Sequence, residues 1–349
     1  MTRWYANPSA RTWTAEPPGT ATPGTARAFH ASLPGYEPTP LVELPALAAE
    51  LGVGRVLVKD ESSRLGLPAF KVLGASWACR QVLDRRPGAH LVTATDGNHG
   101  RAVARTAASL GVGCTVVVPA ELREDTARRI AAEGADVVRV EGDYDVAVRA
   151  AADLAAADPA RELVQDTAFE GYEQVPAWIV EGYSTLLAEV DDQLAADGCA
   201  PADLVAVPVG VGSLAEAVVR HHRAPGRVHP AVLAVEPVGA ACLLASLSAG
   251  RPVVVPTSPT VMAGLCCGTV STAAWPVLHA GCDAAVAVPD AEAARAVDDL
   301  GRLGVSSGPS GAATLAGVRA ALAVPARRAE LDVGQGSVVV LLSTEARPG

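Results

Sequence analysis

The stretch Leu204-Val-Ala-Val-Pro-Val-Gly-Val-Gly-Ser-Leu-Ala-Glu-Ala-Val-Val-Arg-His-His222 joins an apolar run to a helical segment through a glycine-rich turn. The run 204–207 has the length of a strand, and residues 213–222 have the length of a short helix. Gly210 and Gly212 allow the backbone to turn sharply between them. A strand that leads through such a turn into a helix is typical of a parallel α/β sheet.

The rest of the chain repeats this alternation. Nine apolar runs have strand length, and most are rich in β-branched residues: 56–58, 91–93, 115–118, 137–140, 163–164, 204–207, 232–235, 284–288 and 338–342. Segments of helical length lie between them, for example 98–110, 121–133, 143–157, 173–197 and 290–303. The alternation predicts an α/β fold with mostly parallel sheets flanked by helices. Residues 1 to 40, rich in Pro, Thr, Gly and Ala, predict an extended arm on the domain surface or a partner subunit.

Composition excludes several classes of protein. The net charge is −10 and the basic residues form no block, which argues against nucleic acid and membrane partners. No apolar run is long enough to span a membrane, and no secretory signal is visible. The seven cysteines are odd in number and irregularly spaced, which argues against a disulfide framework or metal site and makes the cytoplasm the default location. The adjacent Cys266 and Cys267 leave packing and redox roles open.

The chain has 26 arginines but only two lysines, Lys59 and Lys71. Arginine cannot lose its proton in a protein and cannot act as an amine nucleophile, whereas lysine can. A lysine kept in this background is therefore a candidate for imine chemistry, although a surface lysine kept by chance is the alternative for Lys59. Lys71 opens a helix, and the positive helix end is expected to lower the pKa of its amine.

The loop Thr93-Ala-Thr-Asp-Gly-Asn-His-Gly-Arg101 follows a strand and precedes a helix. Its hydroxyl and backbone N–H groups suit a substrate carboxylate. Asp96 fits such a site only if the ligand also carries a cation, and a helix-capping role is the alternative. His99 is expected to be a buried hydrogen-bonding residue rather than a catalytic one.

The Gly210–Leu214 turn predicts a phosphate site at a helix N-terminus. The same residues fit a dinucleotide fingerprint, and Glu236 lies where a ribose-binding acid is expected. Lys71 and the 93–101 loop argue against that alternative, because neither has a role in dinucleotide binding. Near the C-terminus, Ser343 ends the last strand, where its hydroxyl is suited to a hydrogen bond with a pyridine nitrogen.

Together these segments resemble the fold-type II enzymes that use pyridoxal 5′-phosphate, and within them the diaminopropionate ammonia-lyases. The resemblance covers nearly the whole chain. It rests on the 93–101 loop, the glycine turn and segments such as Tyr36–Leu41, Val58–Ser62, Val164–Tyr172, Pro176–Ile179, Val235–Pro237, Met262–Leu265 and Ser343–Glu345.

The resemblance implies a role for each candidate residue. Lys71 would form the Schiff base with the cofactor, and Asp96 and Asp166 would be the active-site acids. Asn98 would hydrogen-bond the cofactor's 3′-oxygen, and Ser343 would face its pyridine nitrogen. The phosphate would be bound by Gly210, Val211, Gly212, Ser213 and Leu214, and the substrate by Thr95, Asp96, Gly97 and His99. No metal is implied. The reaction would be α,β-elimination of 2,3-diaminopropionate to pyruvate and ammonia.

Three departures from the family's pattern keep other substrates open. Thr269 stands in a segment that usually carries an acid, Pro309 replaces a usual Glu, and Ala346 replaces a usual Gly. The alternatives are a serine or threonine dehydratase and a β-replacement enzyme acting on another β-substituted amino acid. A non-catalytic or nicotinamide-binding relative is a third hypothesis.

We expect two domains. Residues 1–75 and 190–349 would form a large cofactor-binding domain, and residues 76–189 a small mobile domain inserted in it. The cofactor would lie in the cleft, where closure excludes water. The resemblance also implies a homodimer with a small amino acid as substrate.

Overall fold

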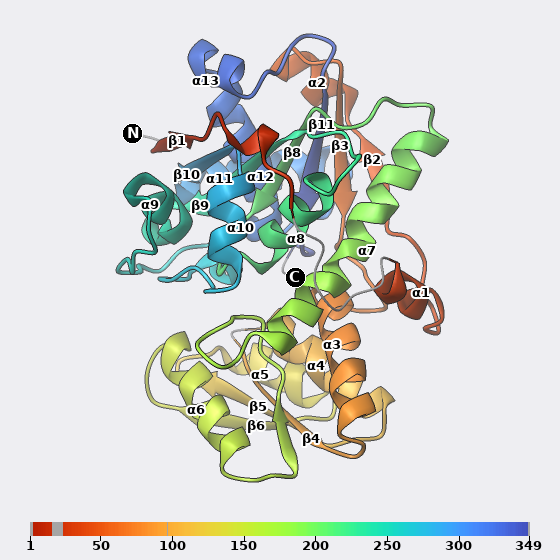
Figure 1. The fold of residues 1–349 in the computed structure, drawn as a ribbon, viewed down its shortest axis with the longest axis vertical. Helices are drawn as coiled ribbons and strands as arrows, with labels where there is room; N and C mark the ends of the chain where they lie inside the picture. The colour runs from red at the N-terminus through yellow and green to blue at the C-terminus, as the bar shows by residue number, and fades with distance from the viewer. Residues whose placement is uncertain (1–2, 16–23, 96, 348–349) are drawn as a thin grey trace.

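The computed structural model describes residues 3–15, 24–95 and 97–347, which form two lobes, each built on its own sheet (Figure 1). The larger sheet has the strand order β1 (Trp4–Ala6), β10 (Ala284–Val288), β9 (Ala231–Pro237), β8 (Leu204–Pro208), β11 (Val338–Ser343), β3 (Arg55–Asp60) and β2 (Leu41–Glu43). The smaller sheet has the order β6 (Asp136–Val140), β5 (Cys114–Pro119), β4 (His90–Ala94) and β7 (Arg161–Leu163). All strand pairs are parallel except those that join β1 and β2 to the edges of the larger sheet.

Helices cover both faces of each sheet. They are α1 (Thr25–Ala31), α2 (Pro45–Leu51), α3 (Lys71–Arg85), α4 (Asn98–Ser109), α5 (Glu124–Ala131), α6 (Tyr144–Ala156), α7 (Gln174–Ala196), α8 (Ser213–His222), α9 (Cys242–Ala249), α10 (Ala274–Gly281), α11 (Asp290–Arg302), α12 (Pro309–Leu322) and α13 (Pro325–Glu330). Short 3-10 turns occur at Ala10–Thr12, Val238–Ala240 and Ala263–Leu265. No helix in the described ranges has both the length and the apolar character needed to cross a bilayer.

The inner strands β8 to β11 of the larger sheet are largely apolar because both of their faces are buried. On β8, Val205 and Val207 pack with α7, α8 and α10, whereas Leu204 and Ala206 pack with α11 and α12 on the opposite face. Continuous apolar runs are therefore the pattern expected for these strands. The nine predicted strands are confirmed as β3 to β11, and the α/β fold class is confirmed with them.

The N-terminal segment differs from its prediction. In its described part the expected extended arm contains strand β1, which pairs with β10, and helix α1. Helix α1 packs against α3 and α7 of the same chain, and its Phe29 ring lies 5.4 Å from the ring of Trp77. The segment therefore packs against its own chain, one of the two placements predicted, but α1 is helical and not extended.

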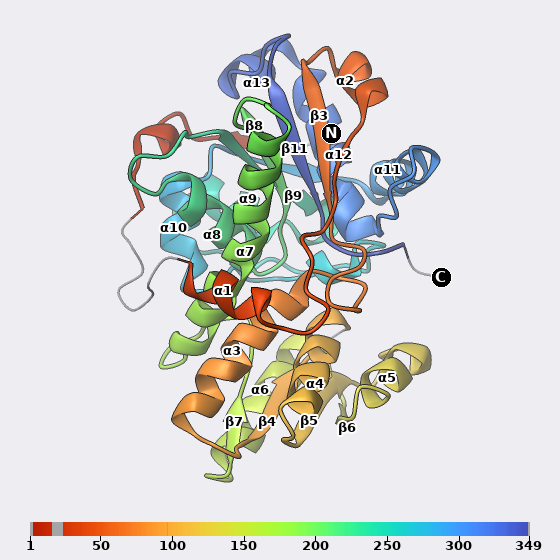
Figure 2. The same ribbon diagram turned by 90° about the vertical axis from the view of Figure 1, so that its right-hand side faces the viewer.

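Helix α7 joins the two lobes. It is 23 residues long and runs from the smaller lobe into the larger one beside α3 (Figure 2). All strands of the smaller sheet lie within the predicted insertion 76–189, but both predicted boundaries fall inside helices, α3 at one end and α7 at the other. The division into a fixed domain and a mobile one stays a prediction.

A buried ionic cluster fastens α7 to the larger sheet. Lys59 on β3 donates to Glu189 on α7 at 2.7 Å, and Arg64 donates to both oxygens of Glu189 and to Glu61. The side chains of all four residues are fully buried. Burial alone would raise the pKa of Glu189, but the hydrogen bonds from Arg64 and the charge of Lys59 hold it below its usual value. Lys59 is thus a structural cation, and the two roles weighed for it, surface residue and imine-forming lysine, are both wrong.

Replacing Glu189 should destabilise the fold strongly. Glu189→Gln leaves Lys59 and Arg64 with too little negative charge, so we expect the free energy of unfolding to fall by about 3–5 kcal/mol. Asp192→Asn, on the same helix, breaks only an exposed pair with Arg27 and should cost less than about 1 kcal/mol. Urea denaturation followed by circular dichroism measures both, and similar small losses would contradict the role of the cluster.

His30 on α1 introduces a pH dependence of stability. Its ring is fully buried, with Nδ1 2.7 Å from the Thr185 hydroxyl and Nε2 2.9 Å from the Leu73 carbonyl oxygen. Burial lowers the pKa of His30 from 6.5 to about 4. The unfolded chain therefore binds the proton more readily, so the folded state loses stability as the pH falls from 6.5 towards 4.

Removing this histidine should flatten the pH profile. We expect His30 to account for a loss of about 3 kcal/mol across that interval, from about 1.4 kcal/mol per pKa unit. Urea denaturation at several pH values would show a shallower slope for His30→Gln than for the wild type. An unchanged slope would mean that His30 is not the responsible group.

Candidate active site

A cavity of about 790 Å³ lies where the two lobes meet. Its walls come largely from loops that follow strands. The described lining residues in these loops are Thr95, Gly97, Asn98, His99 and Arg101 after β4, Asp166 after β7, Pro208 and Gly210–Leu214 after β8, and Thr344–Arg347 after β11. The loop that ends at Lys71 completes it. Carboxyl ends of parallel strands are the expected place for a ligand site. The cavity therefore brings together segments that are far apart in the sequence.

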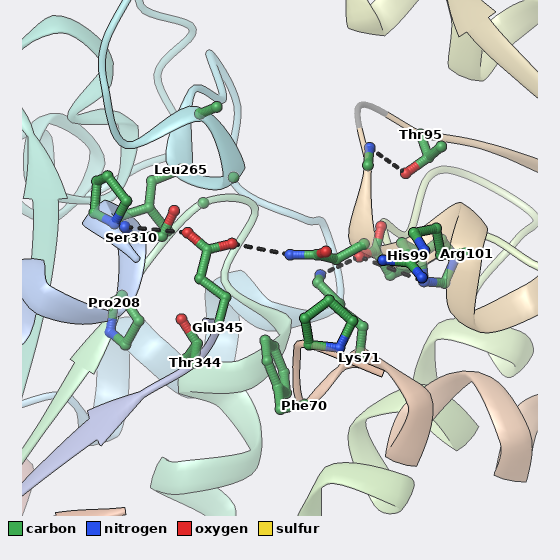
Figure 3. A pocket seen from close by; sticks show the side chains of 18 of the residues that line it. Phe70, Lys71, Thr95, His99, Arg101, Pro208, Leu265, Ser310, Thr344 and Glu345 are labelled. Carbon is green, nitrogen blue, oxygen red and sulfur yellow. Dashed lines mark hydrogen bonds and ion pairs between the residues drawn. The ribbon is translucent and has the colours of Figure 1, made fainter. Parts of the chain in front are cut away.

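Lys71, labelled in Figure 3, and Asp166 both line this cavity and are hydrogen-bonded to each other. Lys71 is the first residue of α3, and its Nζ lies 2.5 Å from Oδ2 of Asp166. Burial alone would raise the pKa of Asp166, but the charge of Lys71 and its hydrogen bond to the carboxylate hold it well below its usual value. The site thus holds a primary amine against an ionised carboxylate, an arrangement that can pass a proton between them.

The loop before α4 is shaped by its own hydrogen bonds. The Thr95 hydroxyl accepts from the backbone N–H of Gly97 at 2.9 Å and of Gly100 at 3.1 Å. A side chain at Gly100 would collide with Thr95, since an added Cβ would lie 2.3 Å from its methyl carbon. Thr95, Gly97, Asn98 and His99 all line the cavity, and their ligand-binding roles stay predictions. Asp96 lies outside the described residues.

His99 is held in one orientation. Its Nε2 lies 3.0 Å from the carbonyl oxygen of Val164, so Nε2 carries the proton that is donated there. Its Nδ1 lies 3.9 Å from Asp166 and has no hydrogen-bond partner among the described residues. Burial lowers the pKa of His99, which leaves the ring neutral. These contacts agree with the expectation of a buried hydrogen-bonding residue.

The turn between β8 and α8 has the features of an anion site. Gly212 has φ +102°, and an added Cβ would lie 2.9 Å from Leu278. At Gly210 an added Cβ would lie 2.9 Å from the carbonyl oxygen of Gly264. Within the described part of the chain, no backbone N–H from Gly210 to Leu214 donates to another group. These N–H groups and the N-terminus of α8 line the cavity and suit a phosphate.

Glu236 does not have the ribose-binding role that the dinucleotide alternative requires. Glu236 is fully buried, and it accepts hydrogen bonds from the backbone N–H groups of Leu243 and Leu244 at 2.8 and 2.7 Å. It therefore caps helix α9 and does not line the cavity. Burial raises its pKa to about 7.

The cavity residues at the end of β11 are Thr344 and Glu345, whereas the sequence pointed to Ser343. Ser343 is buried, its hydroxyl lies 2.8 Å from that of Ser307, and it does not line the cavity. Thr344 and Glu345 line it instead, and Oε2 of Glu345 accepts from Nδ2 of Asn98 at 2.9 Å. The role of Ser343 stays a prediction. Sequence reasoning gave Glu345 no role, because nothing in the motif shows that its side chain turns towards Asn98.

Only some of the unusual positions can touch a ligand. Pro309 and Ala346 line the cavity, whereas Thr269 does not. Cys267 lines it beside Gly210, where an added Cβ would lie 3.2 Å from its Sγ. Four other cysteines are buried, as expected for small packing residues: Cys79, Cys114, Cys242 and Cys282.

The chain is similar to known proteins over nearly its whole length. The family model described as pyridoxal-phosphate dependent enzyme matches residues 32–345. A diaminopropionate ammonia-lyase from Escherichia coli K12 is 35% identical, and the match covers 92% of this chain and 87% of that protein. A biosynthetic L-threonine dehydratase from Mycobacterium leprae is 30% identical over 88% of this chain and 68% of its own. The crystal structure of the Escherichia coli ammonia-lyase in complex with an aminoacrylate–PLP azomethine reaction intermediate has a TM-score of 0.89 and 32% identity, covering 99% of this chain and 94% of that one.

Proposed function

The chain belongs to the family of pyridoxal-phosphate dependent enzymes, and we propose that its reaction is the α,β-elimination of 2,3-diaminopropionate. The products would be pyruvate and two molecules of ammonia, with one water consumed. The observation that carries the proposal is the Lys71–Asp166 pair, placed in one cavity with the glycine turn before α8. The similarity to diaminopropionate ammonia-lyases over nine-tenths of the chain supports the substrate.

The residues present fit pyridoxal 5′-phosphate. The N–H groups of Gly210–Leu214 would hold its phosphate, because among the described residues they donate to no other group. Glycine is needed at 210 and 212, because an added Cβ at either position would collide with neighbouring residues. Lys71 would bind its carbonyl carbon, and Asn98 would bind its ring oxygen. When bound, the cofactor delocalises the electron pair left at Cα and so makes the Cα–H bond acidic.

The chain's own residues would move the protons. Once the Lys71 amine is neutral, it or the Asp166 carboxylate can accept the proton from Cα, and the 2.5 Å between them allows the proton to pass from one to the other. The electron pair then forms the Cα–Cβ double bond as the Cβ–N bond breaks, and the β-amine must be held in its protonated form so that it leaves as neutral ammonia. We assign that role to Asp96 on the chemistry of its loop, in which a carboxylate suits the substrate's second ammonium group. Two acids of this kind would allow both enantiomers to react.

A dehydratase remains the second candidate, because Pro309 and Ser310 line the cavity and the segment Pro309-Ser-Gly311 resembles the corresponding dehydratase segment. The L-threonine dehydratase similarity agrees with it. We also propose a homodimer with a mobile domain of residues 76–189, on the family resemblance, and a cytoplasmic location, on cysteine usage.

The substrate assignment is tested with the loaded enzyme and four amino acids. L- and D-diaminopropionate, L-serine and L-threonine are offered in parallel, and pyruvate or 2-oxobutyrate is measured. We expect diaminopropionate to be the best substrate. Faster keto-acid release from a hydroxy amino acid would favour the dehydratase instead.

Variants of the two acids separate their roles. Asp166→Asn should lower kcat by about 100- to 10,000-fold with every substrate, because it removes a proton acceptor. Asp96→Asn should lower the rate with diaminopropionate more than the rate with L-serine, which has no β-ammonium group. Full turnover of diaminopropionate by Asp96→Asn would contradict the role of Asp96.

The Gly210–Leu214 turn, which we propose binds the phosphate, gives a prediction for cofactor affinity. Gly210→Ala should weaken pyridoxal phosphate binding by at least about tenfold, since the added methyl group meets the Gly264 carbonyl oxygen. Gly334→Ala is the matched control, because nothing lies within 4 Å of a Cβ there. Fluorescence titration of both apoproteins measures the dissociation constants, and equal values would place the phosphate elsewhere.

A further inference from the structure

Glu345 makes a hydrogen bond that crosses the cavity. Glu345, labelled in Figure 3, lies two residues past the end of β11 in the larger lobe. Its Oε2 accepts from Nδ2 of Asn98, the first residue of α4 in the smaller lobe. Its second oxygen, Oε1, accepts from the backbone N–H of Ser310 at 3.3 Å. Both oxygens of the carboxylate are therefore engaged, one on each side of the cavity.

The backbone holds Glu345 in a fixed position. Its carbonyl oxygen accepts from the N–H of Gly308 at 2.8 Å, and the N–H of Ala346 donates to the Pro68 carbonyl at 2.9 Å. Its side chain runs close to Gly308, where an added Cβ would lie 2.8 Å from Cγ of Glu345. The carboxylate is thus confined between the start of α12 and the loop that carries Lys71.

A carboxylate in this position decides how the Asn98 amide is turned. The two ends of an asparagine amide are similar in size, but one end donates and the other only accepts. Both Glu345 oxygens act as acceptors in this structure, so the side chain selects the orientation in which Nδ2 of Asn98 faces it. One N–H of Asn98 is used by Glu345, and a second remains on the same nitrogen for a ligand oxygen.

We propose that Glu345 is a positioning residue that orients the Asn98 amide so that it donates to the ring oxygen of the bound cofactor. The inference rests on the proposed function, because that oxygen belongs to pyridoxal phosphate. A donor at the ring oxygen stabilises its charged form. Glu345 therefore affects the ring's electronic state through Asn98, without touching the substrate.

Glu345→Gln tests this in the full-length protein. A glutamine has one acceptor oxygen and cannot satisfy Asn98 and Ser310 together, so the Asn98 amide loses its fixed orientation. We expect pyridoxal phosphate to bind about tenfold more weakly, the effect of one lost hydrogen bond. We also expect the visible band of the bound cofactor to weaken in favour of the near-ultraviolet band of the form with a protonated ring oxygen.

A double-variant cycle separates positioning from general damage. In an Asn98→Ala background, adding Glu345→Gln should change neither the dissociation constant nor the spectrum, because the residue it acts through is gone. Asp125→Asn, another cavity acid that does not contact Asn98, should leave both unchanged. Equal effects of Glu345→Gln in both backgrounds, or no effect in either, would overturn the inference. A wild-type protein that binds no pyridoxal phosphate would overturn the proposed function as well.

Discussion

The Lys71 ammonium and the Asp166 carboxylate lie 2.5 Å apart, and the rest of the site depends on keeping them together. Asp166 is almost fully buried, and a carboxylate in that position is stable only beside a cation. If the lysine loses its charge on binding a carbonyl compound, Asp166 loses its partner and becomes ready to accept a proton. Burial thus makes an unpaired Asp166 carboxylate unfavourable, and for the same reason it makes that carboxylate a better proton acceptor.

The fold meets two structural requirements of the site around Lys71 and Asp166. The cavity needs loops from both sheets. Helix α7 extends from the smaller lobe and is fastened to the larger one through the buried contacts of Glu189 with Lys59 and Arg64. It also needs backbone that approaches a ligand closely, which glycine provides at Gly210 and Gly212. Packing far from the cavity and turn geometry beside it thus serve the same site.

Much of this could be predicted from the sequence, because it depends on local pattern. Most of the strands β3 to β11 are buried and therefore stand out as apolar runs. The edge strand β6 is largely exposed and is marked only by its three valines, whereas the three-residue edge strands β1 and β2 carry no such signal. Long-range pairings were not predictable. Lys59 pairs with a residue 130 positions away, and Glu345 meets Asn98 across 247 positions, so neither role is visible in the residues nearby.

The attachment point of the cofactor is the most direct test of this account. Since the chain has only two lysines, borohydride reduction of the protein loaded with pyridoxal phosphate, followed by peptide mass mapping, gives a clear answer. We predict the phosphopyridoxyl group on Lys71 alone, because Lys59 is fully buried in its ionic cluster. A label on Lys59, or no label on Lys71, would contradict the assignment of the cavity as the active site.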